Sequence, residues 1–179
     1  MRRVAFVAVS ILLAGIAPSR AADCADPGAL GTARVLVVDP REHRRIGGMQ
    51  YGETLPLADR EVVLTFDDGP RPLFPPRVRE ALAAECVRAT FFVVGRQARA
   101  YPDLVRSLRA DGHSIGTHSE NHPPRFDLLL PEAAIREIDS GIAAAAAALG
   151  AREAVAPFFR FPGLRRSPFA EAARSPRVA

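Results

Sequence analysis

Residues 61–70 read EVVLTFDDGP, an apolar run that ends in two adjacent aspartates and a Gly-Pro turn. Residues 61–66 are rich in β-branched and aromatic side chains, and such a continuous apolar run is typical of a strand buried on both faces. Asp67 and Asp68 therefore directly follow a predicted strand. Adjacent like charges repel each other, and a cation bound between them would offset that repulsion.

Strands and helices alternate from this point onward. Alternation of this kind predicts parallel strands joined by right-handed helical crossovers, in an α/β fold. We expect both faces of the sheet to be covered and the functional residues to gather where the strands end. Further strands are predicted at residues 89–95, 113–118 and 156–162, and helices at residues 75–86, 102–112 and 131–149.

The helix predicted at residues 131–149 has four large aliphatic residues whose spacing places them on one face. We expect this face to pack against the sheet. The six alanines at residues 143–148 are interpreted as helix-forming filler beside it. The aliphatic residues of the predicted face are Ile135, Ile138, Ile142 and Leu149.

Polar side chains follow two further strands. In THSENH, His118 and His122 are four residues apart, a spacing that suits two imidazoles on one metal ion if the segment forms a helical turn. Arg160 lies at the end of the fourth predicted strand. Taken singly, DDGP is typical of a turn. A histidine pair is typical of a polar loop, and an arginine at a strand end is typical of a charged residue at the rim. Because parallel strands end at one edge of a sheet, we interpret the three sets together as a metal site.

Two histidines and one carboxylate leave an open position on Zn²⁺, which is typical of a catalytic site, and Co²⁺ or Mn²⁺ suits the same ligands. Such a cation lowers the pKa of a bound water from its high value in bulk solvent to about 7. One aspartate can ligate the metal while its neighbour accepts the proton, because successive side chains point to different sides. Arg160 is placed to orient the base. His113, at the start of its strand, is predicted to be structural, and His43 receives no role.

These motifs resemble those of the polysaccharide deacetylases of the NodB-homology type, carbohydrate esterase family 4. TFDDGP is similar to the first family motif, HSENH to the second and RFPG, at residues 160–163, to the third. The resemblance spans residues 61–167. It implies a distorted (β/α) barrel, of which this chain supplies about the first four β/α units.

The resemblance also implies roles for individual residues. Asp67 matches the catalytic base, and Arg160 matches the arginine that tunes it. Asp68, His118 and His122 match the metal ligands, and zinc is the usual metal. The implied reaction removes an acetyl group, usually the N-acetyl of a glucosamine unit, from an acetylated polysaccharide or oligosaccharide. An O-acetyl esterase acting on xylan-like polymers is an alternative.

Two later family motifs, an Asp-and-Trp segment and a Leu-x-His that supplies the general acid, have no counterpart here. The sequence contains no tryptophan, and its last histidine is His122. Residues 168–179 also leave the alternation of strands and helices. We therefore expect a gene cut short near residue 167 by a frameshift or an early stop, with an out-of-frame tail. Losing the acid should slow amide hydrolysis by about 10²–10⁴-fold, so an inactive remnant is a further alternative.

The N-terminal residues predict export. Residues 1–22 combine a positively charged start, an apolar stretch and small residues suited to cleavage, as a signal peptide does. The apolar stretch is too short to span a bilayer comfortably, so we expect a periplasmic or secreted protein without a membrane span after cleavage. Residues 23–60 are predicted to form an irregular extension with one short strand at residues 34–40.

Cysteine and charge patterns add two expectations. Cys24 and Cys86 could form a disulfide in an oxidising compartment. Alternatively, Cys24 is a free thiol on a loose terminus and Cys86 is a buried thiol on a helix. The net charge of +4 comes from the two ends of the chain, since residues 160–179 carry five arginines and one glutamate while residues 23–159 are net acidic. Without a basic face, a nucleic-acid partner is not expected.

Overall fold

The computed structural model describes residue 24 and residues 26–47, 51–52, 55–72 and 75–165. The predicted signal peptide at residues 1–22 and the predicted tail at residues 168–179 lie outside the described residues. In the part of the chain that is described, no helix combines the length and the apolar character that crossing a membrane requires.

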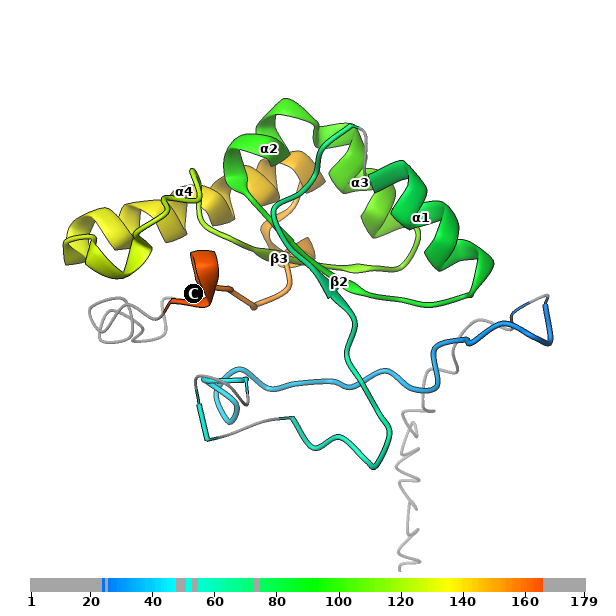
Figure 1. Cartoon of the computed structure of the whole chain (residues 1–179). Helices are drawn as coiled ribbons and strands as arrows, with labels where there is room; N and C mark the ends of the chain where they lie inside the picture. The colour runs from blue at the N-terminus through cyan, green and yellow to red at the C-terminus, as the bar shows by residue number, and fades with distance from the viewer. Residues whose placement is uncertain (1–23, 25, 48–50, 53–54, 73–74, 166–179) are drawn as a thin grey trace, which may run out of the picture.

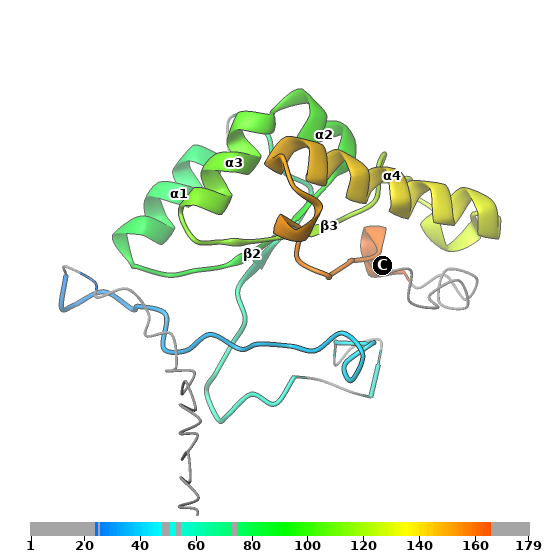
Figure 2. The same cartoon turned by 180° about the vertical axis from the view of Figure 1, so that it is seen from behind.

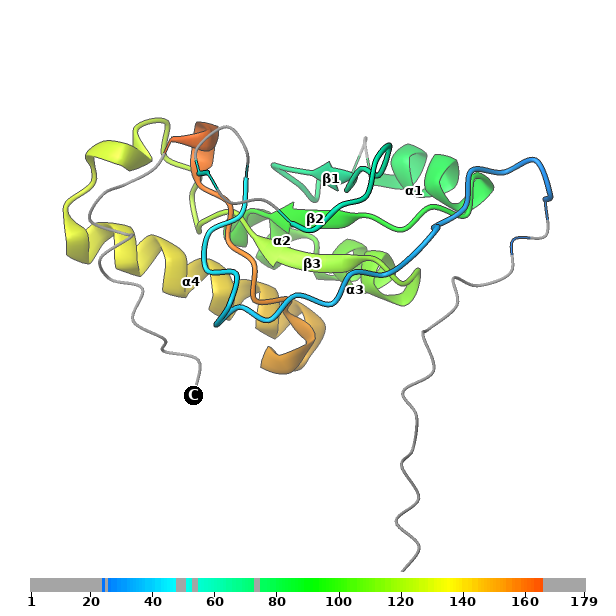
Figure 3. The same cartoon turned by 90° about the horizontal axis from the view of Figure 1, so that it is seen from below.

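A three-stranded parallel sheet lies at the centre of the molecule, with the strands in chain order (Figure 3). Phe66 pairs with Phe91, and Val93 pairs with Thr117. The parallel α/β arrangement confirms the predicted fold class. The strands are shorter than predicted, with bounds β1 (Thr65–Phe66), β2 (Thr90–Val93) and β3 (Ser114–Thr117).

The fourth predicted strand, at residues 156–162, is reduced to a single parallel bridge between Thr117 and Phe159. The Thr117 N–H donates to the Phe158 carbonyl, and the Arg160 N–H donates to the Thr117 carbonyl, both at 2.9 Å. This segment follows α4 and descends beside β3 (Figure 2). It therefore continues the sheet edge and brings Arg160 to the end of β3.

All four α-helices lie on one side of the sheet, and the segment before β1 lies on the other side (Figure 1). Helix α4 has the predicted bounds, and Gly150 follows it as the C-cap with a left-handed backbone (φ 77°). The sequence pattern misses α2, because its six residues, GRQARA, show no apolar periodicity. The helix bounds are α1 (Pro75–Ala84), α2 (Gly95–Ala100), α3 (Pro102–Ala110) and α4 (Pro131–Leu149), and the short 3₁₀ helices are η1 (Phe126–Leu128), η2 (Arg152–Ala154) and η3 (Pro162–Leu164).

Two predictions about strands are wrong. Val62 and Val63, expected to be buried in the first strand, are 86% and 48% exposed. They precede an edge strand, and helices cover only one face of the sheet. The strand predicted at residues 34–40 is irregular instead. An apolar run forms a strand only where a neighbouring strand pairs with its backbone, and these residues have no such neighbour among the described ones.

The core fills the space between the sheet and the helices. Phe91, Val93 and Ile115 enter it from the strands, and Val105 and Leu108 enter it from α3. These five side chains are at most 6% exposed. The strands and α3 therefore form the rigid support on which the loops at the sheet end are built.

The interpretation of the alanine run as filler is also wrong. Ala144, Ala145 and Ala148 of α4 are buried, with at most 4% exposure, whereas Ile135 and Ile142 of the predicted apolar face are only partly buried. Small side chains let a helix backbone approach its neighbours closely. The three buried alanines therefore belong to the contact face of α4, and Leu149 of the predicted apolar face packs against the same core.

The N-terminal extension is attached to the turn that follows α1. Cys24 and Cys86 form a disulfide with a Cα–Cα distance of 5.7 Å. The Gly31 N–H donates to the Glu85 carbonyl at 2.8 Å, and the Thr32 hydroxyl accepts from the Arg88 N–H at 2.8 Å. These contacts link the irregular segment to the α/β body at one corner.

Candidate metal centre

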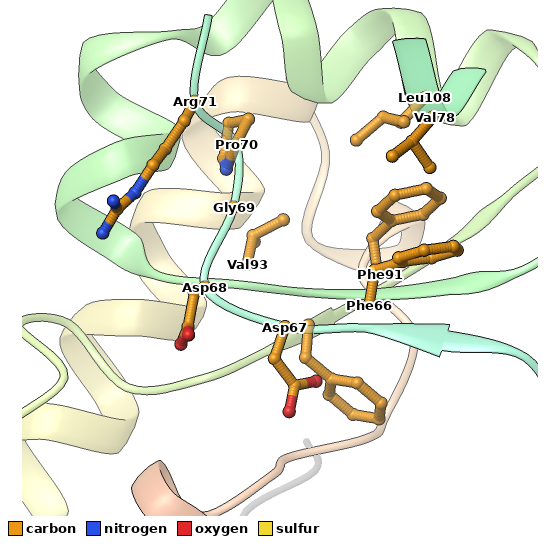
Figure 4. A pocket seen from close by; sticks show the side chains of 11 residues that line it. Phe66, Asp67, Asp68, Gly69, Pro70, Arg71, Val78, Phe91, Val93 and Leu108 are labelled. Carbon is orange, nitrogen blue, oxygen red and sulfur yellow. The ribbon is translucent and has the colours of Figure 1, made fainter. Parts of the chain in front are cut away.

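Asp67 and Asp68 directly follow β1, as the sequence predicts. Asp68 has a left-handed backbone (φ 66°), which is uncommon for a residue other than glycine. The side chains of Asp67 and Asp68 are 29% and 59% exposed. Figure 4 shows both carboxyl groups pointing away from the apolar side chains of Val78 and Leu108. Both carboxylates are therefore open to a ligand at the end of the sheet.

The two histidines of the second motif meet Asp68. His118 follows β3 and is 1% exposed, and His122 lies four residues later. The Asp68 Oδ1 lies 3.1 Å from the His122 Nε2 and 3.4 Å from the His118 Nε2. One ligand atom from each of the three residues lies within 4.8 Å of the others. The structure thus brings together the three residues that the sequence assigns to a metal.

The segment between the histidines is a bend rather than the helical turn that the spacing suggested. Ser119 (φ 65°) and His122 (φ 54°) adopt left-handed backbone conformations. The Ser119 hydroxyl accepts a hydrogen bond from the His122 N–H at 3.0 Å. This bend turns the chain sharply enough to direct both imidazoles towards Asp68.

A hydrogen bond determines which nitrogen of His118 carries its proton. The His118 Nδ1 lies 2.7 Å from the carbonyl oxygen of Arg160. A carbonyl can only accept, so Nδ1 carries the proton and the Nε2 lone pair faces Asp68. Burial is the main cause that lowers the pKa of His118, which favours the neutral imidazole that binds metals.

The donor set fits a divalent metal cation. Two imidazole nitrogens and one carboxylate oxygen converge, and His118 has the outer hydrogen bond that typically fixes a metal-binding histidine. Three protein ligands leave a coordination position open for a further ligand.

Arg160 binds the other aspartate of the pair. Its Nη1 donates to the Asp67 Oδ1 and to the Thr65 hydroxyl, both at 2.8 Å. Its guanidinium carbon lies 4.1 Å from the centroid of the Phe92 ring, a cation–π contact. Thr65 and Phe92 thus help to hold Arg160, and the sequence carries no signal that identifies either of them.

Flanking aromatic residues explain why Arg160 points into the site. In an extended segment, successive side chains alternate between two sides. Phe159 and Phe161 both pack against Phe126, with ring centroids 5.9 and 5.7 Å from it. Because these two rings share one side, Arg160 between them is directed to the other side, where Asp67 lies.

A cavity of about 250 Å³ adjoins the aspartate pair (Figure 4). Asp67 and Asp68 contribute to its lining together with apolar side chains from β1, α1, β2 and α3, among them Val78, Phe91 and Leu108. The aspartate pair therefore lies at the boundary between a polar sheet end and an apolar hollow.

The remaining histidine with a predicted role lies elsewhere. His113 precedes β3 and is 3% exposed. Its Nδ1 accepts a hydrogen bond from the Ala89 N–H at 3.3 Å, and its ring lies 5.1 Å from that of Phe91. His113 thus belongs to the packed body at the opposite end of the strand from His118.

Comparison with known proteins shows where these motifs recur. The polysaccharide deacetylase family model matches residues 55–175. A chitooligosaccharide deacetylase from Sinorhizobium fredii is 44% identical over 78 residues, which cover 42% of this chain and 36% of that enzyme. The match therefore spans about a third of the length of this relative.

Solved structures show the same likeness. A family 4 carbohydrate esterase from Streptomyces lividans, in complex with acetate, superposes with a TM-score of 0.57 at 32% identity, over 62% of this chain and 55% of that one. A family 4 acetyl xylan esterase from Clostridium thermocellum, in complex with a cobalt ion, superposes with a TM-score of 0.54 at 32% identity, over 60% of this chain and 51% of that one. The polysaccharide deacetylase family model also matches more than half of the residues of this chain, and the chain therefore belongs to the polysaccharide deacetylase family.

Proposed function

We propose that this protein is a metal-dependent hydrolase that removes acetyl groups from an acetylated oligosaccharide or polysaccharide, with the N-acetyl group of glucosamine units as the target. One observation carries the proposal: the Asp68–His118–His122 group lies beside the Asp67–Arg160 pair at one end of the sheet. The likeness to a chitooligosaccharide deacetylase supports this substrate class.

Asp68 and the Nε2 atoms of His118 and His122 would hold Zn²⁺. A bound cation would supply a Lewis acid that polarises the acetyl carbonyl and lowers the pKa of water. Zinc suits two imidazoles and a carboxylate with one open position. Cobalt, present in the Clostridium thermocellum esterase, and manganese are compatible with the same donors.

Asp67 is assigned the proton transfer. Arg160 occupies its Oδ1, so Oδ2 is the oxygen that we assign to accept a proton from the attacking water. The water oxygen bonds to the acetyl carbon, the carbon–nitrogen bond breaks, and the proton passes to the departing amine. The products are acetate and a free amino sugar. Arg160 keeps the carboxylate in one orientation throughout.

An O-acetyl esterase activity on xylan-like polymers is the second candidate. The likeness to an acetyl xylan esterase favours it, and the same residues would act in the same roles. The departing group would then be a sugar hydroxyl, which needs less help from an acid than an amine does.

We also propose that the protein acts outside the cytoplasm, in the periplasm or after secretion. The Cys24–Cys86 disulfide supports this location, because disulfides persist in oxidising compartments.

Acetate release tests the proposal. The zinc-loaded full chain should release acetate from acetylated chito-oligosaccharides faster than from acetylated xylan, and the opposite order would favour the esterase. Asp67→Asn should abolish release, whereas Asp59→Asn, on a side chain that is 95% exposed, should not change it. A chain that binds zinc but releases no acetate from either substrate would contradict the proposed activity and support an inactive remnant.

A further inference from the structure

The bend between the two histidines has an unfavourable backbone. Ser119 and His122 both have positive φ values, 65° and 54°, which residues other than glycine rarely adopt. Ser119 is fully buried. A backbone of this kind persists only where the surrounding structure holds it. The position of the His122 imidazole therefore depends on the contacts made to the bend.

Helix α4 makes such a contact through Glu137. The Glu137 Oε2 accepts hydrogen bonds from the N–H of Glu120 at 3.1 Å and of Asn121 at 2.8 Å. Its Oε1 accepts a third from the Asn121 Nδ2 at 2.8 Å. Hydrogen bonds to an ionised acceptor are stronger than neutral ones. One carboxylate thus holds both residues that lie between Ser119 and His122.

Helix α2 holds the same bend from another side. The Gly95 N–H donates to the Ser119 carbonyl at 2.9 Å. The Arg96 N–H donates to the Glu120 carbonyl at 2.9 Å. Helix α2 therefore binds the carbonyl groups of the bend, whereas Glu137 binds its amide groups. The two sets of contacts together satisfy both kinds of backbone group.

Close packing brings Glu137 within reach of the bend. Gly141 lies one helical turn after Glu137, on the same face of α4. A Cβ atom at Gly141 would lie 2.8 Å from the Ser119 carbonyl carbon and 2.9 Å from its oxygen, closer than real Cβ atoms approach. The absence of a side chain at Gly141 therefore lets α4 lie directly against the bend.

We propose that Glu137 is a positioning residue of the metal centre: its carboxylate holds the backbone between His118 and His122 in the conformation that directs the His122 imidazole towards Asp68. The inference rests on the proposed metal site. Glu137 does not ligate the metal in this scheme. It acts through the amides of Glu120 and Asn121, so its loss should weaken metal binding without unfolding the sheet.

Zinc affinity tests the proposal, measured on the full chain by competition with a chromophoric chelator. Glu137→Leu should weaken Zn²⁺ binding about 10-fold, the lower end of the effect of losing a hydrogen bond to a metal ligand, because Glu137 bonds to the bend and not to a ligand. Glu137→Gln should weaken it less, because the amide oxygen can still accept from the two N–H groups. Asp139→Asn removes the same charge from an exposed position of α4 and should leave affinity unchanged. Unchanged affinity in Glu137→Leu would overturn the proposal.

Amide hydrogen exchange supplies a measurement that needs no metal. The N–H groups of Glu120 and Asn121 should exchange about 10-fold faster or more in Glu137→Ala, which offers no acceptor, than in the wild type, while the amides of β2 and β3 keep their rates. This variant keeps the test valid if Glu137→Leu fails to fold. Equal exchange would show that Glu137 does not order the bend. If the wild type bound no zinc, the metal centre itself would be wrong, and exchange would still decide whether Glu137 holds the bend.

Discussion

The Nδ1 atom of His118 lies 2.7 Å from the carbonyl oxygen of Arg160, a residue 42 positions later in the chain. The side chain of the same arginine binds the Asp67 carboxylate at 2.8 Å. Arg160 thus contacts a candidate metal ligand through its main chain and the candidate base through its side chain. Both contacts depend on the backbone pairing of Arg160 with Thr117 beside β3.

This division predicts that replacing Arg160 affects catalysis and metal binding differently. Arg160→Met should lower kcat for acetate release by about 10- to 100-fold, because Asp67 loses the donor that orients it. This decrease is a part of the rate enhancement that a general base contributes. Zinc affinity should be retained, since any residue at position 160 supplies the carbonyl that binds His118. Arg152→Met, at an exposed position, is the matched control. A parallel loss of zinc binding and kcat would contradict this division of roles.

Zinc should stabilise the fold through the histidines. At about 100 times its Kd, a ligand that binds only the native state adds about 2.7 kcal/mol to the free energy of unfolding. The midpoint temperature of thermal unfolding should therefore rise when Zn²⁺ is added to the wild type, and it should return to its original value when a chelator is added. His122→Gln should lose this shift, and His43→Gln, in an irregular loop remote in sequence, should keep it. An equal shift in both variants would place the zinc elsewhere.

Stability should fall as the pH drops below the usual pKa of histidine, about 6.5, and His113 should account for part of the loss. Burial is the main cause that lowers the pKa of His113 in the folded state. The unfolded chain therefore takes up a proton first as the pH falls, which favours unfolding. Protonation would also remove the acceptor that His113 offers to the Ala89 N–H.

Urea unfolding of the metal-free protein at pH 7.5 and at pH 5.5 measures this effect. His113→Gln retains an oxygen that can accept a hydrogen bond but does not titrate. The loss of stability between the two pH values should be smaller in this variant than in the wild type. An identical loss would show that His113 does not contribute to the pH dependence.

The alanine face of α4 should tolerate no enlargement. Ala145 is fully buried, so Ala145→Leu should lower the free energy of unfolding by about 1–3 kcal/mol through overpacking. Ala143 is exposed on the same helix, and Ala143→Leu should change the free energy by no more than about 0.5 kcal/mol. Denaturant unfolding of the two variants measures both changes. Equal changes in the free energy of unfolding would mean that the buried alanines do not form the contact face.

The sequence alone determined the α/β fold class, the bounds of α4 and the set of polar residues that meet at the sheet end. These properties follow from local patterns. Apolar periodicity distinguishes strands from helices, and alternating strands and helices must form a parallel sheet. Residues that directly follow parallel strands then share one edge. Asp68, His118 and His122 come together for this reason, although the longest separation among them exceeds 50 residues.

Only the tertiary structure decided which neighbour covers each surface. The exposure of Val62 results from the edge position of β1, and the burial of Ala145 results from the close approach of α4, and neither is encoded in local periodicity. The same holds for Arg160 and Glu137, whose partners lie far away in the sequence. A pattern of residues reports the conformation of its own segment. Hydrogen bonds and packing between segments depend on distances in space, which the folded chain alone establishes.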